Sequence, residues 1–130
     1  MSRKADVSVR HARREDLEEA ARIFRESFTG SYRYWSLRLL DSLEVLVAEL
    51  EGKIVGAEEV YVTNTPSRGL VGVISFIAVD APYRRKGVGR SLVLVAENLF
   101  GSKGCLYATA STKSNNIASL SLFASLGYSL

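Results

Sequence analysis

A basic turn followed by two closely spaced glycines is the stretch of this sequence best suited to chemistry. Residues 77–92 read Ile-Ala-Val-Asp-Ala-Pro-Tyr-Arg-Arg-Lys-Gly-Val-Gly-Arg-Ser-Leu, an apolar run, a turn and the start of a predicted helix. Gly87 and Gly89 let the backbone come close to a ligand. The first N–H groups of a helix are unpaired and carry the positive end of its dipole. The charges around them are Arg84, Arg85, Lys86 and Arg90. The segment therefore predicts a site for a small anionic group such as a pyrophosphate.

Three glycine motifs compete for this segment. The nucleotide P-loop requires the spacing G-x-x-x-x-G-K-[ST], which is absent. The dinucleotide fingerprint G-x-G-x-x-G lacks its third glycine, because Leu92 stands there, and the segment comes late in the chain. The pattern that fits is Q/R-x-x-G-x-G/A, through Arg84, Gly87 and Gly89.

A second pattern follows nearer the C-terminus. The motif N-x-x-A-x-x-L-Y-x-x-x-G-F aligns with residues 116–128 without gaps, and its identities are Asn116, Leu122 and Gly127. Ser119, Phe123 and Tyr128 replace its Ala, Tyr and Phe. Both patterns, in this order, belong to the GNAT superfamily of acetyl-CoA-dependent N-acetyltransferases. The chain resembles that superfamily over essentially its whole length.

The resemblance implies a place for the cosubstrate acetyl-CoA and no metal. In the superfamily this molecule lies where the fourth and fifth strands splay apart, here residues 70–79 and 105–111. The backbone that would pair with the pantetheine amides belongs to Ile77, Ala78 and Val79. The groups implied at the pyrophosphate are Arg84, Arg85, Lys86, Gly87, Val88, Gly89, Arg90 and Ser91. Asn116 would help to hold the pantetheine arm, and Phe123 would pack near the thioester.

The implied reaction is acetyl transfer to a primary amine by direct attack in a ternary complex. The acceptor is a protein N-terminus, a lysine or a small-molecule amine, and the sequence does not choose among them. Many relatives have a tyrosine acid where this chain has Phe123, so no acid is assigned. The candidate base is Glu58 or Glu59, which alternate faces of a strand; the competing reading is a solvated strand edge.

Two other functions compete with the enzyme. The first is a regulatory module that binds CoA or acyl-CoA without turnover. Two features favour it: the usual acid is missing, and the base is not assigned to one residue. The second is nucleic-acid binding, suggested by an isoelectric point near 9.2. It is disfavoured, because the net charge is only +3 and the basic residues gather at one predicted helix start.

The elements that must position these residues follow a mixed α/β order. Alternation and apolar runs predict strands at residues 7–11, 45–50, 53–63, 70–79 and 105–111. Helical spacing predicts helices at 14–28, 87–100 and 116–126, and residues 31–40 are expected to be a loop with a short second helix. With the resemblance, we expect one domain over residues 1–130 with the GNAT fold, a central mixed, twisted sheet covered by helices on both faces.

Composition sets the class of protein. With 47% hydrophobic and 24% charged residues, the chain is typical of globular domains. Cys105 and His11 are each the single residue of their type, so no disulfide framework and no multi-cysteine zinc site is expected. No signal peptide is recognisable, and no apolar run approaches the roughly 20 residues that span a bilayer. We expect a soluble cytoplasmic protein with no membrane partner.

The aromatic segment and the chain end carry further expectations. Tyr32, Tyr34 and Trp35 fit either the core of a short helix or a wall of the acceptor pocket. Relatives continue after the glycine–aromatic pair with a sixth and a seventh strand, whereas three residues follow Gly127 here. We therefore expect the last strands to be truncated to a stub, leaving an open edge at residues 105–111. A homodimer covering that edge, or an unusually open acceptor site, would follow.

Overall fold

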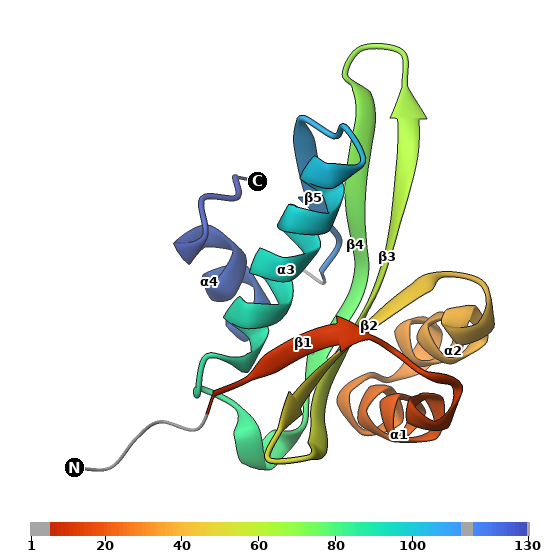
Figure 1. Cartoon of the computed structure of the whole chain (residues 1–130), viewed down its shortest axis with the longest axis vertical. Helices are drawn as coiled ribbons and strands as arrows, with labels where there is room; N and C mark the ends of the chain where they lie inside the picture. The colour runs from red at the N-terminus through yellow and green to blue at the C-terminus, as the bar shows by residue number, and fades with distance from the viewer. Residues whose placement is uncertain (1–5, 113–115, 130) are drawn as a thin grey trace.

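The computed structural model describes residues 6–112 and 116–129 as a mixed sheet lying between two pairs of helices (Figure 1). The strands are β1 (Ser8–His11), β2 (Glu44–Leu50), β3 (Lys53–Thr65), β4 (Gly69–Val79) and β5 (Tyr107–Ala110). The helices are α1 (Leu17–Ser27), α2 (Gly30–Arg38), α3 (Val88–Ser102) and α4 (Ile117–Ser125). Short 3₁₀ turns lie at Arg14–Asp16, Leu39–Asp41 and Ala81–Tyr83. The predicted mixed α/β class is confirmed.

Several predicted bounds need correction. The first helix begins later than predicted because residues 14–16 form a 3₁₀ turn, and the segment expected to be largely loop is mostly the regular helix α2. Strand β5 starts at Tyr107 rather than Cys105, because the Cys105 N–H donates to the Phe100 carbonyl at the end of α3 (3.0 Å).

The expected truncation after Gly127 goes as far as it can within the described residues, since residues 128 and 129 lie in no strand. Gly127 has a φ of 90° and ends α4, and the Tyr128 N–H donates back to the Phe123 carbonyl (3.0 Å). This is the hydrogen bond of a glycine-ended helix cap, so it uses the donor that a strand would need.

The strands follow one another across the sheet in the order β1-β2-β3-β4-β5. Neighbours are antiparallel except β4 and β5, which are parallel. Within residues 6–112 and 116–129, β5 is therefore one edge and β1 the other, so the N-terminal strand does not cover β5.

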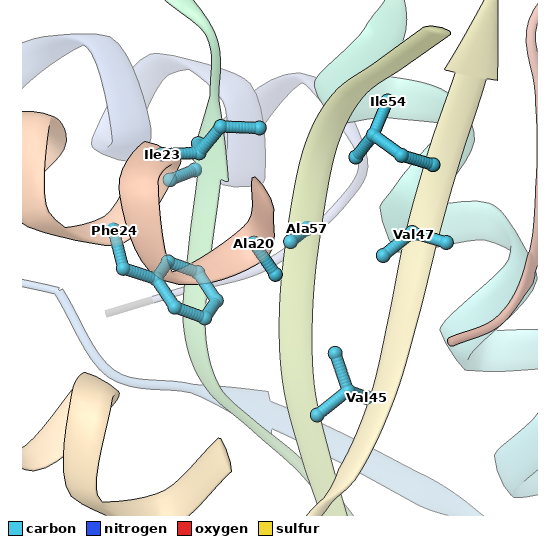
Figure 2. Packing of buried hydrophobic residues seen from close by; sticks show 8 residues of the cluster. Ala20, Ile23, Phe24, Val45, Val47, Ile54 and Ala57 are labelled. Atoms are coloured by element: carbon cyan, nitrogen blue, oxygen red, sulfur yellow. The ribbon is translucent and has the colours of Figure 1, made fainter. Parts of the chain in front are cut away.

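Strand alternation divides the core into two faces. Val45 and Val47 of β2 point to the side of α1, where Ala20, Ile23 and Phe24 pack against them (Figure 2). These three helix residues recur at helical spacing and are fully buried, which is the stripe expected of an amphipathic helix. Leu46 and Ala48 point to the other side, where α3 packs. We call the two sides the α1/α2 face and the α3/α4 face.

A β-bulge in β4 separates its two halves. Glu59 of β3 pairs with Phe76, and the next residue, Val60, pairs with Ile74, so Ser75 is an extra residue without a partner. The pairing of β4 with β5 covers only residues 71–74 and ends with a hydrogen bond from the Ser111 N–H to the Ile74 carbonyl (3.3 Å). Because bulges bend a strand and end its pairing, the second half of β4 diverges from β5.

The aromatic segment packs only in part. Tyr34 and Trp35 are 56% and 49% exposed and contact each other edge to face, so core packing is wrong for both. Tyr32 lies against Phe28 and Phe76 instead, on the α1/α2 face.

Candidate active site

A cleft of about 780 Å³ opens beside the second half of β4. Its walls are the end of α1, the end of β4, the turn into α3 and the start of α4. The lining residues are Ser27, Phe28, Ile77, Ala78, Val79, Tyr83, Arg84, Arg85, Gly87, Val88, Gly89, Arg90, Asn116, Ala118, Ser119, Ser121 and Leu122. The structure thus brings together most of the residues singled out in the sequence.

Lys86, Ser91 and Phe123 are outside this lining. The Lys86 ammonium lies 5.8 Å from the centre of the Tyr83 ring. The Ser91 hydroxyl donates to the Gly87 carbonyl (3.1 Å), which binds it within its own helix. Contacts of these two side chains with a phosphate remain predictions.

The backbone of β4 directs hydrogen-bonding groups toward the cleft. The Asp80 N–H donates to the Val55 carbonyl of β3 (2.8 Å). Along an antiparallel strand such bonds alternate, so Ala78 also bonds toward β3, whereas the N–H and C=O groups of Ile77 and Val79 point away from it. The Arg84 guanidinium confirms this direction, since its Nε donates to the Val79 carbonyl from the cleft side (2.9 Å).

The start of α3 forms a positively charged end wall. Gly87 caps the helix with a φ of 85°, a left-handed conformation that suits glycine, and Arg85 also has a positive φ of 62°. Arg84, Arg85 and Arg90 line the cleft around the unpaired first N–H groups of the helix. Backbone donors, helix dipole and guanidinium groups are together the features that suit a bound anion, and the anion site itself stays a prediction.

Gly89 serves packing as well as access. A Cβ added there would lie 3.1 Å from the Leu122 Cδ2 atom and 3.7 Å from a Val79 methyl carbon. The missing side chain therefore lets α4 approach α3 closely at the cleft. The sequence reading assigned Gly89 to ligand approach alone, because the contact with α4 is not visible in one dimension.

Asn116 begins α4 as its cap. Its Oδ1 accepts a hydrogen bond from the Ser119 N–H (3.1 Å), the usual way in which an asparagine satisfies a free helix donor. The side chain also lines the cleft, so capping and ligand contact fall on one residue.

Phe123 lies in the core behind the cleft. It is 6% exposed and its ring stacks edge to face on Tyr128 at 5.1 Å. Burial, with the Glu97 and Glu58 carboxylates nearby, raises the pKa of the Tyr128 hydroxyl above its usual value. Tyr128 is also outside the cleft lining, so the structure offers no replacement acid at this position.

Glu58 and Glu59 are fully buried, so the prediction of a solvated strand edge is wrong. Glu58 shares its register with Leu46 and Ile77 and points to the α3/α4 face. Glu59 shares its register with Val45 and Phe76 and points to the α1/α2 face. None of their carboxylate oxygens has a hydrogen-bond partner among the described residues. Burial raises the pKa of Glu59 to about 8 and that of Glu58 well above its usual value.

An ionic link that the sequence reading missed joins α1 to the turn after β4. Arg22 of α1 binds Asp80 (2.9 Å) as well as Glu19 and Glu26 of its own helix. Hydrogen bonding to Arg22 lowers the pKa of the buried Asp80 carboxyl. No sequence signal connects positions 22 and 80, because the pair depends on the packing of α1.

The part of the chain that the structure describes was also searched for metal sites and for membrane-spanning helices. No group of three His, Cys, Asp or Glu side chains there could hold a metal ion. No helix there is long and apolar enough to cross a membrane. The cytoplasmic location stays a prediction.

The chain was compared with protein families and with solved structures. A family model described as acetyltransferase (GNAT) family matches residues 10–128. An aminoglycoside N-acetyltransferase, AAC(6′)-Iy in complex with CoA, shares the fold at 18% identity and a TM-score of 0.81, covering 100% of this chain and 92% of that one. A ribosomal-protein-alanine N-acetyltransferase from Brucella melitensis biovar Abortus 2308 does so at 19% identity and 0.81, covering 96% and 93%.

A transcriptional regulator from Bacillus halodurans C-125 has the same fold at 22% identity and a TM-score of 0.84, covering 95% of this chain and 93% of that one. Among curated proteins, no sequence matches this chain significantly. Proteins with different functions thus share this architecture. The comparison with solved structures therefore shows the fold and does not identify the acceptor.

Proposed function

Because the chain belongs to the GNAT acetyltransferase family, we propose that it transfers the acetyl group of acetyl-CoA to a primary amine by direct attack in a ternary complex. The observation that carries the proposal is the cleft in which the outward-facing backbone of Ile77 and Val79 adjoins the basic start of α3. This arrangement suits a long ligand that has amides at one end and phosphates at the other.

The residues present fit such a ligand in three respects. The amides of a pantetheine arm need strand-like partners, and Ile77 and Val79 have N–H and C=O groups directed toward the cleft. A pyrophosphate needs several donors at once, and the turn of residues 84–90 carries helix N–H groups and guanidinium groups. Gly87 and Gly89 have no side chains, so the ligand can come close to the backbone there.

The chemical step requires a carbonyl polariser and a base. A backbone N–H of β4 polarises the thioester oxygen, while the amine nitrogen attacks the carbonyl carbon. The carbon–nitrogen bond forms, the carbon–sulfur bond breaks, and the electron pair of that bond leaves with sulfur as thiolate. Phe123 carries no proton to give, so the thiolate is protonated by the amine or by water.

We assign the base to Glu59 rather than Glu58. Glu59 points to the α1/α2 face, to which Phe28 at the wall of the cleft also belongs. With a pKa of about 8, its carboxyl can both accept and release a proton near neutral pH. Glu59 is fully buried on β3, one strand away from the cleft, so the proposed transfer needs a water between its carboxyl and the amine.

The test is turnover with a panel of amines. The purified chain is mixed with acetyl-CoA and with peptides bearing free N-termini, lysine derivatives, polyamines or aminoglycosides, and free thiol is followed. We expect thiol release that depends on one amine class. Tight acetyl-CoA binding without thiol release from any amine would instead support the second candidate, a CoA-binding regulatory module, which Phe123 at the usual acid position favours.

We also propose that two copies pair along β5. Within the described residues, β5 pairs with β4 alone, and Leu106 beside it is 87% exposed. Unpaired strand edges favour pairing with another chain. Light scattering at micromolar concentration should give the mass of a dimer, and Leu106→Lys should give that of a monomer with unchanged acetyl-CoA affinity. A monomeric wild-type chain would exclude the pairing.

A further inference from the structure

One guanidinium group of the cleft is bonded to the cleft's own walls. The Arg84 Nε donates to the Val79 carbonyl (2.9 Å), and its Nη2 lies 3.4 Å from the Ser27 hydroxyl. All three residues line the cleft. The Arg84 side chain therefore connects the end of β4 with the end of α1 inside the proposed cosubstrate site.

The short turn after β4 makes this contact possible. Residues Ala81–Tyr83 form a 3₁₀ turn, and the Arg84 N–H donates back to the Ala81 carbonyl (3.3 Å). The turn brings residue 84 back toward residue 79, so a side chain as long as arginine reaches the Val79 carbonyl. Arg84 is also exposed, so its guanidinium can change partners by rotation of the side chain alone.

The Val79 carbonyl is one of the groups that the proposed function gives to the pantetheine amides. A carbonyl oxygen has two lone pairs, but a guanidinium on the cleft side takes the approach that an amide N–H in the cleft needs. The contact of Arg84 with Val79 therefore competes with a bound pantetheine arm.

The positive charge of Arg84 is not neutralised by these contacts. Both of its acceptors are uncharged, and no carboxylate of the described residues forms an ion pair with it. A phosphate has a full negative charge and accepts two guanidinium N–H groups side by side, which a single carbonyl cannot do. A phosphate at the start of α3 would therefore draw Arg84 away from Val79.

Arg22 provides an internal contrast. Its guanidinium makes five hydrogen bonds, all of them to the carboxylates of Glu19, Glu26 and Asp80. Asp80 is the only acidic residue from β4 to the start of α3, and it is buried. Moving Arg22 would leave that buried carboxylate unpaired, so Arg22 is fixed. Because Arg22 takes Asp80, Arg84 is left with neutral partners and is free to exchange them.

We propose that Arg84 makes the cleft selective for phosphorylated thioester carriers over pantetheine derivatives that lack phosphate. Without a phosphate, its guanidinium stays on the Val79 carbonyl and opposes binding of the pantetheine arm. With a phosphate, it moves to the anion and leaves the carbonyl to the amide. This inference rests on the proposed function, because it assigns a specificity residue to the same cleft.

The experiment compares two probes, CoA and pantetheine, which share the arm and differ in the phosphates. Each is titrated into the chain and followed by NMR chemical shifts, which needs no turnover. Arg84→Ala and Arg84→Met should weaken CoA binding, yet strengthen pantetheine binding at least threefold. Arg84→Met keeps most of the length of the side chain, so it separates the lost hydrogen bond from the lost bulk.

The matched control is Arg90→Ala. Arg90 also lines the cleft, but it has no hydrogen bond or ion pair with another described residue. We expect this variant to bind CoA more weakly and to change pantetheine affinity less than 1.5-fold. Thermal unfolding of each variant verifies that it is folded.

The outcomes separate this inference from the proposed function. Unchanged or weaker pantetheine binding in the folded Arg84 variants overturns the selection, even if the enzyme acetylates amines. Stronger pantetheine binding in both Arg84 variants, but not in Arg90→Ala, supports the selection even if no thiol is ever released, a result that would defeat acetyl transfer alone. A wild-type chain that binds no CoA would overturn both.

Discussion

The two ends of the cleft are built in opposite ways. The end proposed for the pyrophosphate is exposed, positively charged and made mainly of one continuous segment, residues 84–90, with the backbone as its main donor. The end proposed for the base Glu59 is buried and aromatic, burial favours the protonated form of its carboxyl, and the residues around it come from α1, α2, β3 and β4. The proposed phosphate site thus follows from local chain geometry, whereas the surroundings of the proposed base depend on side chains that only tertiary packing brings together.

The largest expected effect breaks the first end and spares the second. Gly89→Glu places a bulky anion among the phosphate donors, and its Cβ would already lie 3.1 Å from Leu122. We expect acetyl-CoA affinity to fall at least 100-fold in calorimetric titration, while thermal unfolding verifies that the variant is folded. Arg14→Ala, on the exposed 3₁₀ turn before α1, is the matched control and should bind normally. Equal acetyl-CoA affinity of the wild type and Gly89→Glu would show that the phosphates do not bind at the start of α3.

The second prediction concerns the buried carboxyls and pH. Burial raises the pKa of Glu59 to about 8, above the value of about 4.3 expected in an unfolded chain, and raises that of Glu58 in the same direction. The folded chain therefore holds protons that the unfolded chain releases, and its stability is full below about pH 4 and falls as pH rises toward 8.

The measurement is the unfolding temperature between pH 5 and 9. We expect the wild type to lose about 5 °C or more over this range relative to a Glu58→Gln, Glu59→Gln double variant. Arg84→Ala, at the exposed end, should follow the wild-type curve. Parallel curves for the wild type and the double variant would show that the two carboxyls are ionised in the folded chain at neutral pH.

A smaller effect tests whether side-chain charge adds to the backbone at the phosphate end. Arg84 donates to the Val79 carbonyl and lies near the Ser27 hydroxyl (3.4 Å), so its guanidinium is partly occupied within the chain. We expect Arg84→Ala to weaken acetyl-CoA binding about threefold to tenfold, and Arg84→Lys less. A loss as large as that of Gly89→Glu would mean that the side chain, and not the helix start, is the main phosphate ligand.

The smallest effect is expected at Phe123. A tyrosine there would restore the acid that many relatives carry, but the ring is buried against Tyr128 and is outside the cleft lining. We expect Phe123→Tyr to change turnover less than threefold and to leave acetyl-CoA affinity unaltered. A tenfold gain in turnover would show that the new hydroxyl reaches the leaving sulfur.

The position of residues 84–90 at a turn into a helix could be predicted from the sequence for a physical reason. A turn, two glycines and a helix start are short-range features, so residues 84–90 carry their own geometry wherever the fold places them. The strand at residues 70–79 was also accessible, because an apolar run reports burial directly.

The buried end was not predictable in the same way. The alternation of side chains along a strand correctly placed Glu58 and Glu59 on opposite faces of the sheet. It could not show that helices cover both faces at this position. Carboxylates are normally exposed, so the ordinary expectation was a solvated edge. The prediction of core packing for Tyr34 and Trp35 was wrong for the opposite reason, since aromatic side chains suggest burial but these two are exposed. Tyr32 is the residue of this segment that packs against Phe76.

The unpaired Ser75 has a consequence for how such a chain can change by inheritance. Ile74 and Ile77 lie on the same face with two residues between them, where a regular strand has one. Loss of the Ser75 codon would leave every core side chain of β4 on its present face, yet it would straighten the strand and let it pair further with β5. We therefore expect a single in-frame deletion to narrow the cleft while the fold survives, so that one residue of chain length decides whether the proposed ligand site exists.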